Sequence, residues 1–143
     1  MRPTQIPGSL ALLGILVVAV SLVVVSPARA TDDACLSDTR TLNLLLSVGD
    51  LAGDALSLTD IGEYGLAVGR ANRAIKLITS KPLPCNTYLR RAKGNQMTSV
   101  TYIKRGVGAY RNGNTVSVDR YIRLATFYYG KVGDAIDDYR DSR

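Results

Sequence analysis

The chain has 143 residues, 46% of them hydrophobic, and its 18 lysines and arginines against 12 acids give a net charge of +6. It contains no histidine and only two cysteines, which excludes Ser-His-Asp triads and Cys-His nucleophiles and makes a poor metal site. We therefore expect no catalytic residue, no cofactor and no metal, and the moderate charge does not lead us to expect nucleic acid as a partner.

The first thirty residues are typical of a secretory signal peptide. Arg2 precedes an uncharged stretch in which residues 10–25 are almost purely apolar, and Ala28-Arg29-Ala30 places small residues where signal peptidase reads them. The apolar run has 16 residues, and a membrane span needs about 20. We predict cleavage after Ala30, rather than a retained anchor, and export to the periplasm, the cell envelope or the extracellular space.

The remaining residues, 31–143, are predicted to form one domain, since a chain of this length can bury a single core. Cys35 and Cys85 indicate one disulfide in an exported chain. Closing a loop of that length would stabilise the fold by about 4 kcal/mol in the chain-entropy model.

The charges are unevenly distributed along this domain. Asp32–Glu63 carries a net charge of −6, Tyr64–Lys131 carries +12, and the residues from Val132 onward carry −2. The basic part could attract a polyanion, or the acidic part could pair with it inside one bundle. We favour pairing within the bundle.

Four stretches show the 3.6-residue period of a helix, and no strand pattern of comparable length competes with them. The first is predicted over residues 34–56, with small residues at Gly49, Ala52 and Gly53 that would let another helix approach closely. Its inward stripe is predicted to contain Cys35, Thr39, Leu42, Leu45 or Leu46, Gly49, Ala52 or Gly53, and Leu56.

The second helix is predicted over residues 61–79. Asp60 would be its N-cap, with Glu63 completing a capping box, and Pro82 and Pro84 follow its end. The predicted inward residues are Ile61, Tyr64, Val68, Ala71, Ile75 and Ile78, with Arg70, Arg73 and Lys76 on the opposite side.

The third and fourth helices are predicted over residues 87–111 and 116–140, joined by a turn at residues 112–114. The third should bury Leu89, Ala92, Gln96, Val100, Ile103, Val107 and Tyr110. The fourth should bury Val118, Tyr121 or Ile122, Ala125, Tyr129, Val132, Ile136 and Tyr139.

These elements predict an all-α fold, an up-down-up-down four-helix bundle made of two antiparallel helical hairpins. The start of the first helix and the link between the second and third would then lie at the same end. Cys35 and Cys85 occupy those two places, so topology and disulfide agree. Residues 62–78 resemble the second-helix half of a tetratricopeptide repeat at Gly62, Tyr64, Ala67 and Ala74, but no copy recurs after about 34 residues. We interpret this match as helix packing.

The candidate contact residues lie on predicted exposed faces. Phe127 falls among Arg120, Arg123 and Lys131, where it could anchor a partner, or a neighbouring helix could cover it. Tyr102 and Tyr128 could extend the same patch. Arg70, Arg73 and Lys76 form a basic strip, and Arg90, Arg91 and Lys93 form a basic cluster near the disulfide end.

We expect a small, exported, non-catalytic binding protein, such as an inhibitor or accessory subunit, whose partner is another protein. The alternative is a module that binds an anionic envelope surface, either membrane headgroups or cell-wall polymer. A small hydrolase would require a pocket that gathers two or more acids, and adjacent pairs such as Asp137 and Asp138 point apart on a helix.

Overall fold

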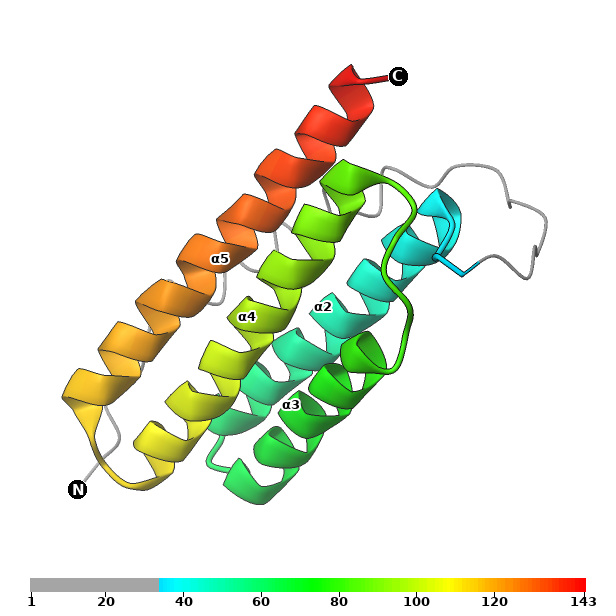
Figure 1. Ribbon diagram of the computed structural model, residues 1–143. Helices are drawn as coiled ribbons and strands as arrows, with labels where there is room; N and C mark the ends of the chain where they lie inside the picture. Colours follow the sequence, from blue (N-terminus) through cyan, green and yellow to red (C-terminus); the bar gives the residue numbers. More distant parts are fainter. Residues whose placement is uncertain (1–33) are drawn as a thin grey trace.

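The computed structural model describes residues 34–143, and the predicted signal segment lies outside them. This part of the chain forms four helices: α2 (Asp38–Asp60), α3 (Tyr64–Thr79), α4 (Thr87–Arg111) and α5 (Thr115–Asp141). Figure 1 shows successive helices running in opposite directions, so that the links α2–α3 and α4–α5 lie at one end and the α3–α4 link lies at the other. The predicted all-α, up-down-up-down bundle is confirmed.

The helix α2 begins four residues later and ends four residues later than the sequence pattern predicted. Ser37 is its N-cap, and the Ser37 hydroxyl accepts a hydrogen bond from the Arg40 amide over 3.4 Å. At the other end the helix continues through Asp60, and Gly62 makes the turn with a φ of 84°. That conformation costs glycine little and most other residues considerably more.

The predicted capping box at the start of α3 was therefore wrong. Asp60 still belongs to α2, and the N-cap of α3 is Glu63, whose side chain makes no capping hydrogen bond. Ile61, predicted to face inward, is 72% exposed because it lies in the turn rather than on the buried side of a helix.

The boundaries of α4 and α5 agree with the prediction to within one residue. The Asn86 side chain accepts hydrogen bonds from the Tyr88 and Leu89 amides over 2.9 and 3.2 Å, which caps the start of α4. Asn114 caps α5 by accepting from the Ser117 amide over 3.1 Å. Asparagine suits both places because its short side chain satisfies amides that have no partner within the helix.

The helix α4 lies at the centre of the arrangement and packs against each of the other three helices. α2 and α3 pack against one another and against α4, whereas the backbone of α5 approaches only that of α4. The side chains of α2 and α5 nevertheless share a buried cluster, in which Leu42 and Leu45 accompany Val132 and Ile136.

The buried face of α2 is wider than the predicted stripe, because this helix has neighbours on more than one side. It includes Thr41, Leu44, Val48 and Ala55, which the sequence pattern did not assign to the core. By contrast, a Cβ at Gly53 would meet no atom within 4 Å, so this glycine is not explained by a close helix approach.

Small residues do bring helices together elsewhere. α3 faces the bundle with Ala67, Ala71 and Ala74, all fully buried. On α4, a Cβ at Gly106 would lie 3.3 Å from Cδ1 of Ile122 on α5. The buried Ser99 hydroxyl donates to the Ala125 carbonyl over 2.8 Å and ties the same two helices together.

Candidate functional site

The disulfide end of the bundle is held by covalent and hydrogen bonds. Cys35 and Cys85 form the predicted disulfide, with their Cα atoms 5.0 Å apart. Beside it, the Leu36 amide donates to the Leu83 carbonyl over 2.8 Å, and the Cys85 amide donates to the Leu36 carbonyl over 2.9 Å. The segment before α2 and the α3–α4 link therefore form one connected unit.

A row of aromatic rings crosses the seam between α4 and α5. Tyr102 of α4 stacks between Tyr121 and Tyr128 of α5, with ring centroids 6.2 and 5.8 Å apart. Phe127 meets Tyr128 edge-on at 5.3 Å. Phe127 is 58% exposed, so no neighbouring helix of the described chain covers it. The three tyrosines are half-buried, and the row leads from the interior of the seam to an open ring.

Two cations lie over this row. The Arg105 guanidinium is 5.6 Å from the centre of the Tyr102 ring, and the Lys131 ammonium is 5.6 Å from the centre of the Phe127 ring. Lys131 also forms an ion pair with Asp134 at 3.1 Å. We define Phe127, Tyr128, Tyr102, Tyr121, Arg105 and Lys131 as the aromatic row.

Arg120 and Arg123, the other predicted contact residues on α5, are exposed but take no part in these ring contacts. Arg123 pairs with Asp119 one turn earlier, at 2.7 Å. Arg120 is exposed. The row thus gathers Phe127 and Lys131 from the predicted set and adds Arg105 and Tyr121. The sequence held a signal for this. Tyr121 and Tyr128 are two helical turns apart and Tyr102 and Arg105 are one turn apart, so each pair lies on one face of its helix.

The basic strip on α3 lies apart from the α5 residues of this surface, because the backbones of α3 and α5 do not approach one another. Arg73 and Lys76 are exposed, and Arg70 lies 3.9 Å from Asp54 of α2. Within residues 34–143 that is the one ion pair joining acidic α2 to the basic part of the chain. The predicted charge pairing inside the bundle is therefore slight.

The basic cluster at the start of α4 is largely used to hold the structure. Arg90 donates to the Pro84 carbonyl over 2.6 Å, and Arg91 pairs with Asp138 of α5. Lys93 donates to the Lys81 carbonyl over 2.8 Å, and burial lowers the pKa of Lys93.

Comparisons of the chain with models of known protein families, with curated proteins and with solved structures found no match.

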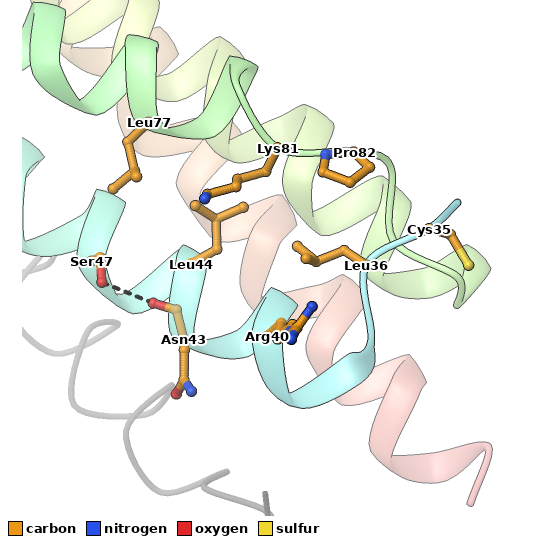
Figure 2. A pocket seen from close by; sticks show the side chains of 9 residues that line it. All are labelled: Cys35, Leu36, Arg40, Asn43, Leu44, Ser47, Leu77, Lys81 and Pro82. Carbon is orange, nitrogen blue, oxygen red and sulfur yellow. Dashed lines mark hydrogen bonds between the residues drawn. The ribbon is translucent and has the colours of Figure 1, made fainter. Parts of the chain in front are cut away.

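A pocket of about 450 Å³ opens beside the disulfide, between α2 and the end of α3 (Figure 2). Its lining residues are Cys35, Leu36, Arg40, Asn43, Leu44, Ser47, Leu77, Lys81 and Pro82. None of them is acidic, so the pocket lacks the carboxylate pair that a small hydrolase would need. Arg40 and Lys81 were not singled out from the sequence. Arg40 follows Cys35 by five residues and Lys81 precedes Cys85 by four, so the disulfide pairing itself placed them at one end.

The described residues contain no group of three or more acids, cysteines or histidines arranged to hold a metal ion. None of the four helices combines the length and apolar character that crossing a membrane requires.

Three tyrosines have pKa values raised by burial. Burial raises the pKa of Tyr129 to about 12, an effect that the nearby Gln96 amide partly offsets and the charge of Asp50 reinforces. Burial also raises the pKa of Tyr110 and of Tyr139. These shifts oppose the ionisation that a tyrosine nucleophile or base would need.

Proposed function

We propose that the protein is an exported, non-catalytic binding protein that contacts a partner protein through the aromatic row. The observation that carries the proposal is the 58% exposure of Phe127 at the end of three stacked tyrosines. A large aromatic ring gains free energy when a partner removes it from water, and aromatic and arginine side chains are the commonest hot spots of interfaces.

The stacked rings make this surface rigid as well as apolar. Tyr128 is held by stacking on Tyr102 of the neighbouring helix, and Phe127 is held by its edge-on contact with Tyr128, so both lose little side-chain entropy when a partner binds. Arg105 and Lys131 border the rings, which favours a partner that presents acidic groups around an apolar centre.

Export is part of this proposal and rests on the sequence pattern of residues 1–30 together with the disulfide, a bond that persists in oxidising compartments. The expected N-terminus of the exported protein is Thr31. N-terminal sequencing of the protein recovered from outside the cytoplasm checks this, and recovery of residues 1–30 in that protein would refute cleavage after Ala30.

The experiment for the partner is co-purification from the native extracellular or envelope fraction. The bait is the exported protein, compared with its Phe127→Ala and Val116→Ala variants. Val116 is the matched control because it is also on α5, is 80% exposed and lies outside the aromatic row. We expect a protein that binds the unmodified bait and the Val116 variant and that is lost with Phe127→Ala.

The alternative function is attachment to an anionic envelope surface. Its support is the set of exposed cations, including Arg73, Lys76 and Arg120, for which the described residues supply no ion-pair partner. Salt separates the two functions. Binding through the aromatic row should persist at about 1 M ionic strength, where surface charges are screened within about 3 Å, whereas charge-driven attachment should be lost.

A further inference from the structure

The pocket beside the disulfide has two chemically different sides. Leu36 and Leu44 are largely buried, at 8% and 6% exposure, and present an apolar wall that Leu77 and Pro82 continue. Figure 2 shows these side chains coming from four segments of the chain. Leu44 belongs to α2, Leu77 belongs to α3, and Leu36 and Pro82 belong to the two segments joined at the disulfide.

The polar side carries only positive charge. Arg40 and Lys81 line the pocket and are both exposed, and no described carboxylate lies within ion-pair distance of either. Asn43 and Ser47 complete the polar rim, and the Ser47 hydroxyl donates to the backbone carbonyl of Asn43 over 3.0 Å.

The pocket is also firmly built. The disulfide and the two backbone hydrogen bonds of Leu36 hold one wall, and the Lys93 ammonium holds the carbonyl of Lys81. Its volume of about 450 Å³ lies within the range of about 300–1,000 Å³ usual for small-molecule sites.

We propose that this pocket binds a free single-chain anionic amphiphile, such as a fatty carboxylate, with its chain on Leu36, Leu44 and Leu77 and its head at Arg40 and Lys81. An apolar wall next to two cations complements a molecule that has an apolar chain and one anionic group. A small inorganic anion would leave the apolar wall wet, and a neutral chain would leave both cations without a counter-charge. This site is separate from the aromatic row on α4 and α5 and does not depend on the function proposed for it.

The test uses the exported protein, unreduced, titrated calorimetrically with decanoate and with decanol. The two ligands share a chain and differ in head charge. We expect decanoate to bind about tenfold more tightly than decanol, because charge-assisted hydrogen bonds to Arg40 and Lys81 form only with the carboxylate. The amide NMR signals of Leu36, Leu44 and Ser47 should move with decanoate.

The decisive variant is Arg40→Gln/Lys81→Gln, which should abolish the preference for decanoate while leaving decanol binding unchanged. Its matched control, Lys104→Gln/Arg111→Gln, removes the same charge from two exposed positions on α4 outside the pocket and should keep the preference. Far-UV circular dichroism verifies that both variants remain helical.

Three outcomes of the experiments with decanoate and decanol would overturn the proposal. They are equal affinity for decanoate and decanol, an unchanged preference in the pocket variant, and shifted NMR signals confined to other parts of the bundle. Vesicles of phosphatidylcholine with phosphatidylglycerol test whether the pocket instead takes its anionic group from a lipid in a membrane. Sedimentation with these vesicles but no response to decanoate would assign the anion site to a lipid surface and refute a site for free amphiphiles.

Discussion

Removing the disulfide should weaken the bundle by about 4 kcal/mol. Cys35 and Cys85 are 50 residues apart in sequence, and a closed loop of that length lowers the entropy of the unfolded chain by an amount equivalent to about 4 kcal/mol. Cys85 is exposed and Cys35 is half-buried, so replacing both by alanine removes little packing. The effect should therefore come mainly from the unfolded state.

The assay is urea unfolding of the protein and of Cys35→Ala/Cys85→Ala, followed by far-UV circular dichroism because the chain has no tryptophan. For an m-value of about 1.5–2 kcal/mol/M, the midpoint should fall by about 2–3 M. Since the chain has two cysteines in all, a reductant acts on this bond alone. It should reproduce the effect in the unmodified protein and change nothing in the double variant.

A loss smaller than about 1 kcal/mol would refute the reasoning, because the bond would then not restrict the unfolded chain as its loop length requires. Thiol labelling without reductant gives an independent check. We expect no reactive thiol before reduction and two after it, since the described residues include no free cysteine.

Two glycine replacements on α4 should have opposite effects in urea unfolding. Gly94→Ala should raise the free energy of unfolding by about 0.5–1 kcal/mol, because a Cβ there meets no other atom. Gly106→Val should lower it by about 1–3 kcal/mol, because the larger side chain displaces Ile122. A destabilised Gly94→Ala would contradict the open space there. The pKa of Tyr129 is about 12 in the folded protein and about 10 in the unfolded chain, so Tyr129 contributes about 2–3 kcal/mol to the free energy of unfolding. This contribution is fully present below pH ~10 and is lost by pH ~12. Alkaline unfolding should show this loss, and Tyr129→Phe should reduce it; equal pH slopes would refute the assignment.

Helix boundaries were predictable where a side chain caps the first turn of the helix. Asn86 and Asn114 both do so, and α4 and α5 start within one residue of the predicted positions. Asp60 was misassigned because the capping-box pattern is also compatible with a helix that simply continues. The longer α2 is favoured because Thr59 is buried in it, where the Thr59 hydroxyl donates a hydrogen bond to the Ala55 carbonyl over 2.7 Å.

The candidate sites were only partly predictable for a related reason. Periodicity assigns each residue to a face of its own helix, and it placed Phe127 correctly on an exposed face. It cannot say which face of a neighbouring helix lies alongside. The stacking of Tyr102 with Tyr121 and Tyr128 depends on how α4 and α5 align, which the packing at Gly106 and Ser99 sets.

The all-α fold, the order and direction of the helices and the pairing of Cys35 with Cys85 were predictable from the sequence, because they follow from helical period, short turns and the number of cysteines. The separation of the basic strip on α3 from Phe127, and the position of Arg40 and Lys81 beside one pocket, became visible only once the helices were packed. These are relations between residues far apart in sequence, and they arise from which helices pack together rather than from any one helix.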